Sequence, residues 1–545
     1  MRNLLKISLV LFLGGITVLQ AQESSGLDTE DITVVKDYEA RIADAQKINV
    51  NPKVADVELP APELTYNVPS RLLELKYPPH SMKPYSMPKV KATDYNHSYI
   101  KLGFGTQYSP LAEMVYINKD IDDLEFGAYF KHLSSYGQKV ENQKFRDNQL
   151  GVFAKYNLEK VLIGTNFKFQ QDVDYFYGYN QEDTTFSAGD VTHRVREIGG
   201  DISIQNAAIG KKNFDHKQVI TTSFANDNFK VNEWFLNYRA DFTKVNKNKH
   251  FFNIHADIDV SNYTPSAPNR GDLEREVFQF GSDYTFNNDD WKLTAGVTAA
   301  IGDINDAQQF NIYPKLYTEK MLYKNYLIFY SGWSRILQKN TYLNFAQENP
   351  FINYDIMLEN SRIENRMAGF KGAIGQFTYS TRFSNKVVKQ MPLFVNDSAD
   401  MKRFDVVYDK SMTIINVNLE AAYDWNKKFR SLLSFDFNLY EPDGQEKAWH
   451  LPMINTNFST SYLLKEKLLM RAELYGVAGA FGRDMNGDAQ KIKGMVDINL
   501  AANYQFTKYL SFFAQMNNLA NFKYQKWYNY PTFGFNAMVG VQFRY

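Results

Sequence analysis

The chain of 545 residues contains no cysteine. It therefore cannot form a disulfide framework, bind a metal through thiolates or carry the lipidated cysteine of a lipoprotein. After residue 22, no stretch reaches the ~20 apolar residues that a membrane-spanning helix needs. Basic and acidic residues balance at 61 each, so the net charge gives no reason to expect nucleic acid as a partner.

The first 22 residues have the pattern of a secretory signal peptide. Arg2 and Lys6 supply the positive charge, residues 7–19 form an apolar run, and Ala21 offers a small residue for cleavage. The alternative is an uncleaved anchor, but the apolar run is shorter than a membrane-spanning helix. The sequence thus predicts export from the cytoplasm.

Proline is concentrated in one early part of the chain. Eight of the 17 prolines lie between Pro52 and Pro88. Because proline lacks the N–H that a β-ladder needs, this part is not expected to be sheet. We interpret residues 23–97 as a Pro-rich periplasmic or lumen-filling extension without a recognisable plug, and a disordered linker is the alternative.

From Ser98 onward, apolar and polar residues alternate, as in strands that have one face in lipid and one in water. The clearest segments lie at 252–260, 414–425 and 496–506, and aromatic residues make up 15% of the chain. A soluble sandwich would also alternate. A membrane barrel additionally has short turns at one rim and longer loops at the other.

The connections do alternate in length. Short turns are expected near residues 157–160, 245–249, 287–290, 426–428, 465–467 and 507–508, and longer connections at 171–190, 335–360, 390–410, 441–453, 481–491 and 518–532. Counting strands this way gives about 22, provided that 195–206 and 214–225 are both strands. The predicted fold is all-β: a transmembrane antiparallel β-barrel over residues 98–545, closed by a last strand from Phe533 to Tyr545.

The C-terminal region resembles TonB-dependent receptors. Asn518, Leu519, Asn521 and Tyr524 match the Asn-Leu-Phe-Asn-Lys-x-Tyr-like stretch that precedes the closing strand in that family. The family's Pro-Gly-Arg element is replaced by residues 531–534, which lack the arginine. The resemblance implies a 22-stranded barrel whose last aromatic residues, here Phe543 and Tyr545, form the signal for barrel assembly.

The resemblance extends weakly to the N-terminus. The run Asp31, Ile32, Thr33, Val34 and Val35 is similar to the box through which such receptors contact TonB, although a short extended segment is the alternative. The family also carries a plug domain of more than a hundred residues, for which residues 23–97 are too short. The chain therefore looks like a plug-less barrel of the kind found in Bacteroidota.

Inward positions of the predicted strands include charged residues that could line a polar route or seat a plug. The lumen-facing candidates are Glu420, Asp436, Arg471, Glu473 and Asp497. They could equally be an ordinary wetted face, because alternation alone places polar residues there. No His-Glu-x-x-His, nucleophile elbow or Gly-rich phosphate loop occurs, so neither an enzyme, a metal site nor a cofactor is expected.

Two functions follow from these observations. The first is porin-like or receptor-like nutrient uptake across the Gram-negative outer membrane, with membrane lipid and TonB as partners. The second is a non-transport structural or assembly subunit, with a lipoprotein or another barrel as partner. The missing plug favours the second function, and the family resemblance favours the first.

Overall fold

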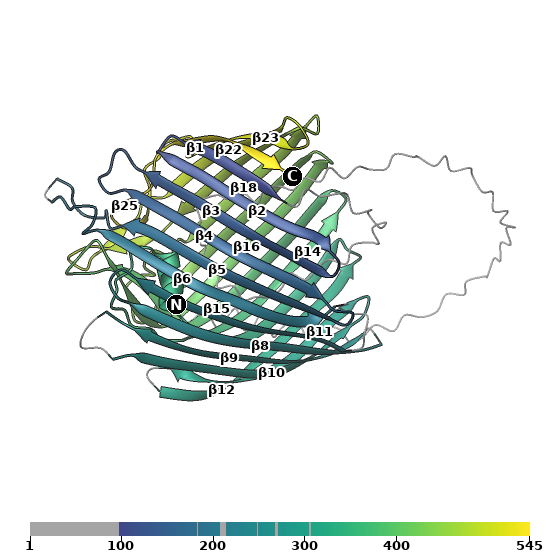
Figure 1. The fold of residues 1–545 in the computed structure, drawn as a ribbon. Helices are drawn as coiled ribbons and strands as arrows, with labels where there is room; N and C mark the ends of the chain where they lie inside the picture. The colour runs from purple at the N-terminus through teal and green to yellow at the C-terminus, as the bar shows by residue number, and fades with distance from the viewer. Residues whose placement is uncertain (1–97, 183, 208–213, 248, 267–270, 305–306) are drawn as a thin grey trace, which may run out of the picture. The chain divides into compact units, whose positions relative to one another are not determined.

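The computed structural model describes residues 98–182, 184–207, 214–247, 249–266, 271–304 and 307–545. These residues form one closed sheet of 22 antiparallel strands (Figure 1). Residues 1–97 lie outside the described part, and with them the expected signal peptide, the Pro-rich extension and the TonB-box-like segment. Among the described residues, no helix is long and apolar enough to cross a membrane.

The strands of the barrel follow one another around the wall. They are β1 (Tyr99–Gly105), β2 (Ser109–Ile121), β3 (Leu124–Tyr136), β4 (Lys144–Asn157), β5 (Val161–Tyr175), β6 (Thr192–Asn206), β7 (Phe214–Asp227), β8 (Asn232–Asn246), β9 (His250–Thr264), β10 (Leu273–Asn287), β11 (Trp291–Ile304), β12 (Ala307–Tyr323), β13 (Leu327–Gln338), β14 (Ser361–Ile374), β15 (Phe377–Asn396), β16 (Phe404–Asn426), β17 (Phe429–Glu441), β18 (Ile454–Leu464), β19 (Leu468–Ala478), β22 (Met495–Gln505), β23 (Leu510–Asn517) and β26 (Asn536–Arg544). The two strands on which the predicted count depended are present as β6 and β7.

Shorter elements lie in the connections at one end of the barrel. They are β20 (Phe481–Arg483), β21 (Ala489–Lys491), β24 (Gln525–Trp527), β25 (Tyr530–Pro531) and the helix α2 (Tyr342–Glu348). The two strand pairs form small hairpins, β20 with β21 and β24 with β25, that do not join the wall.

The last strand closes the cylinder on the first. β26 pairs with β1 from Tyr99↔Arg544 to Gly105↔Met538. Gly103 lies opposite Gly540 in this seam, and the Phe513 ring from β23 packs where a Cβ on either glycine would stand. Because β1 pairs with β2 on one side and β26 on the other, neither of its edges is left open, as a barrel in lipid requires.

The two faces of the wall differ as the alternation predicts. On β26, Val539 and Phe543 are exposed on the outside, by 62% and 48%, whereas Gln542 is 4% exposed and faces the lumen. The same division holds on β16, where Val417 is exposed and Asn416 and Asn418 are buried. An apolar exterior and a polar interior are what a barrel in lipid needs.

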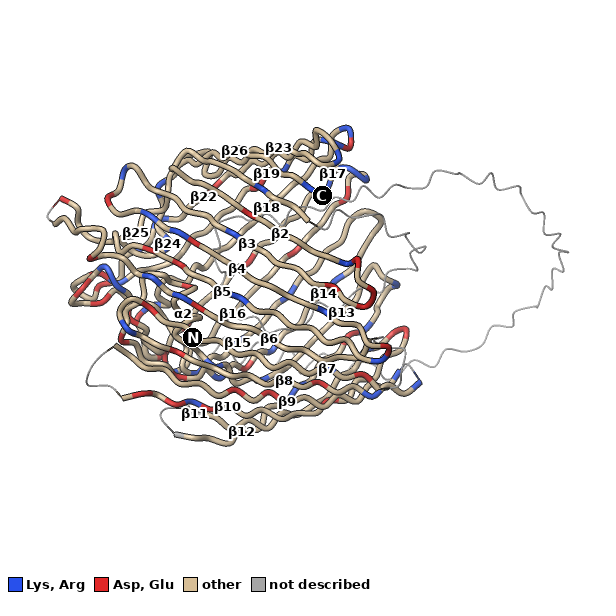
Figure 2. Tube along the Cα trace, viewed as in Figure 1, with Lys and Arg blue, Asp and Glu red and all other residues tan. Residues whose placement is uncertain are grey.

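The two ends of the barrel also differ. The chain enters at Ser98 and leaves at Tyr545 on the end that carries the short turns, where the Tyr545 N–H donates to the Ser98 carbonyl at 3.0 Å. The long connections gather at the opposite end, on the left in Figure 1. Figure 2 shows charged residues at both ends of the strands. Long loops mark the outer end of such a barrel and short turns the periplasmic end.

Two predicted boundaries are wrong. Phe533 and Phe535 precede the closing strand, because side-chain amides bind this backbone in place of a ladder: Asn518 donates to the Phe533 carbonyl at 3.2 Å and Asn521 accepts from the Phe535 N–H at 2.9 Å. The long connection expected at 390–410 is mostly strand. β15 and β16 stay paired as far as Asn396↔Phe404, which leaves only residues 397–403 as a loop.

Candidate functional site

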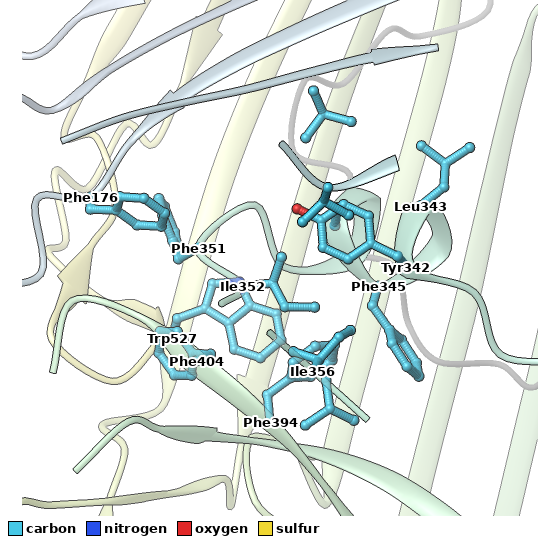
Figure 3. Packing of buried hydrophobic residues seen from close by; sticks show 14 of the residues in the cluster. Phe176, Tyr342, Leu343, Phe345, Phe351, Ile352, Ile356, Phe394, Phe404 and Trp527 are labelled. Atoms are coloured by element: carbon cyan, nitrogen blue, oxygen red, sulfur yellow. The ribbon is translucent and has the colours of Figure 1, made fainter. Parts of the chain in front are cut away.

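The outer loops pack together into an apolar core, which we call the loop core. It contains residues from the connections after β5, β7, β13 and β23 and from the ends of nearby strands, including β15 and β16. Its members are Phe176, Tyr177, Val191, Val195, Ala225, Val231, Tyr263, Tyr342, Leu343, Phe345, Ala346, Phe351, Ile352, Ile356, Leu358, Phe394, Phe404, Val406, Trp527 and Tyr530. Figure 3 shows 14 of these side chains, which converge from separate segments of the chain.

The loop core spans the mouth of the barrel. β5 and β15 are ten strands apart in a closed wall of 22, so they lie on nearly opposite sides. Phe176 follows β5 and Phe394 lies two residues before the end of β15, yet both belong to the same core. Between them Phe351, from the loop after β13, stacks on Tyr530 with a 3.6 Å separation of ring centroids. The loops thus bridge the lumen with aromatic side chains.

Helix α2 fastens one side of the loop core to the wall. Thr341 caps the helix by accepting a hydrogen bond from the Asn344 N–H at 3.1 Å. Both oxygens of the buried Glu233 carboxylate, on β8, accept from the N–H groups of Tyr342 and Leu343 at 2.9 Å each. These N–H groups have no partner within the helix, so a carboxylate is well placed to bind them.

The Tyr342 hydroxyl adds a second anchor for α2. It donates to Asp227 at 2.8 Å and lies 3.2 Å from Nε2 of His193, whose Nδ1 faces the Pro350 carbonyl at 2.7 Å. Burial, together with the neighbouring Asp227 carboxylate, raises the pKa of Tyr342 well above its ordinary value. The hydroxyl therefore keeps its proton and remains a donor.

His450 holds the opposite side of the loop core. Its Nδ1 donates to the Phe394 carbonyl at 2.9 Å, and its Nε2 accepts from the Tyr528 N–H at 3.2 Å. The ring also contacts Trp527, with 5.2 Å between ring centroids. Burial lowers the pKa of His450 to about 4, an effect that nearby Lys526 reinforces. The imidazole is therefore neutral at pH 7 and ties two outer loops to β15.

Beside His450 lies a pocket of about 100 Å³. One side is the polar inner wall of β15 to β18, with Lys386, Asn416, Asp436, Asn438 and Asn455, and the other comes from the outer loops, including Trp449, Lys493, Tyr524 and Trp527. The pocket thus combines amides, cations and flat aromatic surfaces, a lining suited to a small organic solute.

Three cations, Lys386, Lys493 and Lys526, and two carboxylates, Glu348 and Asp436, line this pocket. Asp436 accepts hydrogen bonds from Asn418 at 3.0 Å and from Asn416 at 3.3 Å. In the described part of the chain, no carboxylate forms an ion pair with Lys386 or Lys493. The excess of cationic side chains in this half-buried pocket favours an anionic solute.

The five predicted lumen-facing residues all lie on the inner face, but only Asp436 lines the pocket. Glu473 is buried and accepts from Asn457 at 2.5 Å, while Asp497 is 2% exposed. Glu420 is more accessible, and Arg471 is half-buried. The structure does not bring these five together into one site, and within the described residues no group of three or more acidic or histidine side chains could hold a metal ion.

Sequence reasoning missed the residues that form the loop core and the pocket. Tyr342, His450 and Trp527 come from three separate loops, and loops have no periodic pattern. The density of aromatic residues at 527–530, inside a predicted outer loop, was the available signal. Phe543 and Tyr545 are 48% and 53% exposed on the outer wall. Their role as an assembly signal stays a prediction.

Comparison with known proteins gives matches in structure alone. No family model and no curated protein sequence matches the chain. The FrpB iron transporter of Neisseria meningitidis is 11% identical, with a TM-score of 0.66 over 82% of this chain and 81% of that one. The ferric yersiniabactin uptake receptor FyuA of Yersinia pestis is 12% identical, with a TM-score of 0.61 over 82% and 80%.

A third similar structure is the siderophore receptor PirA of Acinetobacter baumannii, with 8% identity and a TM-score of 0.64 over 84% of this chain and 81% of that one. Identities this low establish the fold alone. The sequence resemblance is confirmed at that level, because these proteins share the barrel described here. The chain forms a closed 22-stranded antiparallel barrel with the fold of these transporters and receptors.

Proposed function

We propose that this barrel takes up a small nutrient across the outer membrane and binds it in the pocket beside His450. The observation that carries the proposal is a polar and aromatic pocket on the lumen side of a receptor-like barrel. Lys386 and Lys493 would attract an anionic group, and Trp449 and Trp527 would pack against a flat apolar part. The similar structures are named for iron or siderophore uptake, so iron-limited growth is the first condition to examine.

Energy for uptake would come from TonB through residues 31–35. This segment lies outside the described residues, and its support is the sequence resemblance. The experiment compares a strain lacking the gene with strains expressing the full chain, a chain without residues 31–35, or Lys386→Met. The proposal expects slower growth or solute uptake for all but the full chain.

The outward-facing Lys389→Met, three residues along the same strand, is the matched control for Lys386→Met. Lys389 is exposed on β15 and does not line the pocket. Uptake that is normal without residues 31–35 would contradict TonB coupling. Equal uptake by the Lys386→Met and full-length chains would contradict the assigned pocket.

A second function is favoured by the loop core. An apolar core that bridges the mouth suits a barrel that serves as a structural or assembly subunit, in partnership with a lipoprotein or another barrel. Residues 23–97 would then fill the lumen or remain in the periplasm. Native purification from solubilised outer membranes separates the two functions, since a stoichiometric protein companion with no uptake defect supports the subunit function.

A further inference from the structure

The outer halves of β12 and β13 are not paired with each other. The two strands pair only as far as Lys315↔Ser334. Beyond this pair, residues 308–314 of β12 pair with β11 alone, and residues 335–338 of β13 pair with β14 alone. Pro314, which has no N–H to offer a neighbour, is the first residue past the last pair. No described strand pairs with the free side of residues 308–314, which we call the β12 edge.

The outer half of β13 passes on the lumen side of β12. Leu337 lies on the same face of β13 as Trp333, whose partner Leu316 is exposed on the outer wall. Leu337 nevertheless packs with Val277 and Tyr313, which belong to the inner faces of β10 and β12. The two strands therefore overlap, with β13 on the inside, and the β12 edge remains open on the outside.

The β12 edge stands at and beyond the outer boundary of the membrane. Ile312 and Phe310 lie 11 and 13 residues along β12 from Tyr323 at the turn end. At ~3.4 Å per residue and a tilt of ~45°, these positions are about 26 Å and about 31 Å above the turns. The apolar band of such barrels is ~25 Å tall. Phe310 and Ile312, which are 64% and 59% exposed, therefore offer an apolar surface that a protein outside the cell can reach.

Polar groups without partners lie behind the β12 edge, in the overlap. Within the residues that the structure describes, the Tyr313 hydroxyl, Asn311 Nδ2 and Arg362 Nε are buried and have no hydrogen-bond partner. Arg362 lies opposite Leu337 in the ladder of β13 and β14, and the charges of Arg362 and Arg335 both act on the Tyr313 hydroxyl. Each of the three unpartnered groups can donate a hydrogen bond, and burial without an acceptor is costly. Acidic side chains are thus the chemistry that suits this overlap.

The charge beside the overlap also favours an acidic partner. The Glu364 carboxylate accepts from Arg335 Nε at 2.8 Å and also pairs with Arg366. The Arg335 and Arg366 side chains are 40% and 60% exposed, so both guanidinium groups retain free donors. Together with Arg362, these groups place three cations around one carboxylate, which leaves a net positive charge.

An open strand edge is completed by another extended segment, whose backbone continues the ladder. The side chains of such a segment would alternate between the outer face, beside Phe310 and Ile312, and the inner face, over the overlap. A second copy of the barrel in the same membrane does not fit. A two-fold axis along the membrane normal would tilt its β12 by ~45° in the opposite sense, so the two strands would cross and could not pair.

We propose that the β12 edge binds an extended segment of an extracellular protein in which acidic and apolar residues alternate. The backbone of this segment adds a strand beside β12. Its acidic side chains bind Tyr313, Arg335 and Arg362. Its apolar side chains pack beside Phe310 and Ile312.

The test uses the full chain in detergent and fluorescent peptides of the length of the β12 edge. The first peptide alternates valine with glutamate, the second has glutamine in place of glutamate, and the third is the glutamate peptide with every backbone nitrogen methylated. Fluorescence anisotropy measures the affinity of each peptide. We expect the glutamate peptide to bind at least tenfold more tightly than either of the others, because only it supplies both carboxylates and backbone N–H groups.

A double variant tests the acidic contacts. Arg335→Gln/Arg362→Gln should reduce the affinity of the glutamate peptide to that of the glutamine peptide. The matched control is Arg430→Gln, which should change nothing: Arg430 is exposed and paired with Asp424, but it lies at the turn end of β17. Heat-modifiable gel migration checks that each variant is folded.

A cross-link locates the bound peptide, since the chain contains no cysteine. A glutamate peptide with cysteine at one valine position should form a disulfide with Ile312→Cys. It should not do so with Leu316→Cys, which faces the same way within the paired part of β12. Equal binding of the glutamate and glutamine peptides, equal binding of the methylated peptide, or preferential cross-linking to Leu316→Cys would each overturn the proposal. Full displacement of the glutamate peptide by inorganic phosphate would assign the arginines to a free anion and contradict it as well.

Discussion

Acidification is expected to loosen the loop core on the side held by His450. At neutral pH this buried imidazole is uncharged and donates to the Phe394 carbonyl while accepting from the Tyr528 N–H. A proton on Nε2 would remove the acceptor and place a charge among aromatic rings near Lys526. The protonated ring is therefore more stable in an opened loop, where water can surround it.

The magnitude follows from the difference in pKa between the closed and open states. In the closed state the pKa of His450 is about 4, and in an open loop it returns to 6.5. Because the closed-state pKa is the lower one, the stabilisation is complete above pH 6.5 and is lost as the pH falls toward 4. The loss amounts to about 2 kcal/mol at pH 5 and about 3 kcal/mol below pH 4.

The absence of cysteine makes a spin-label experiment direct. Labels on Glu446→Cys and Gln347→Cys, both exposed, would report the separation between the loop after β17 and helix α2 by double electron–electron resonance. We expect a narrow distance distribution at pH 7.5 that broadens between pH 6 and 5. In the His450→Gln variant, whose side chain cannot titrate, the width of the distance distribution should be the same at all pH values. The same broadening in that variant, or none in the unsubstituted protein at pH 4.5, would refute the reasoning.

Three further predictions concern the wall and the opposite anchor. Val539→Lys, on the lipid face, should lower the free energy of unfolding, measured with urea in vesicles, by about 2–4 kcal/mol. Asn536→Lys should have little effect on it. Gly540→Ala forces a Cβ against the Leu102 carbonyl oxygen, so it should cost about 1–3 kcal/mol and lower the temperature of the gel-mobility shift. Glu233→Gln weakens two charge-assisted hydrogen bonds to α2, which contribute about 1.5–3 kcal/mol each. This variant should raise the conductance of the barrel in planar bilayers, whereas Glu274→Gln, at an exposed position, should not.

The barrel could be predicted because its determinants are local and repetitive. Val496, Ile498 and Leu500 alternate with polar residues, and the structure exposes all three on the outer wall. The parity of turn and loop lengths then determined the strand count, since each hairpin reverses direction. The boundary at Phe533 failed because a strand end depends on which group binds the backbone, and here the groups are side chains of Asn518 and Asn521.

The candidate site could not be predicted in the same way. The pocket brings Lys386 on β15 together with Lys493 and Trp527 from two later loops, and neither local propensity nor spacing encodes such contacts. The pairing of β12 with β13, which stops at Lys315↔Ser334, is similar in this respect. Pro314 marks the residue where pairing stops, but proline is also tolerated in ordinary edge and bulge positions, so the register of the neighbouring strand had to be known.

If the barrel transports a solute, the two anchors of the loop core decide where its mouth opens. The α2 side is held by charged groups: Glu233 on the helix N–H groups, the ion pair of Lys339 with Asp259, and Arg275 on the Asn340 carbonyl. Hydrogen bonds to charged groups contribute about 1.5–3 kcal/mol each, against about 0.5–1.5 kcal/mol for neutral ones. On the opposite side, the Asp409 carboxylate holds the loop after β17 by accepting from the N–H groups of residues 443–445, whereas the loop after β23 is held to His450 by a neutral bond from the Tyr528 N–H. Opening should therefore leave α2 in place and displace residues 518–535, which also supply part of the loop side of the pocket, so one movement would both widen the mouth and expose the solute site.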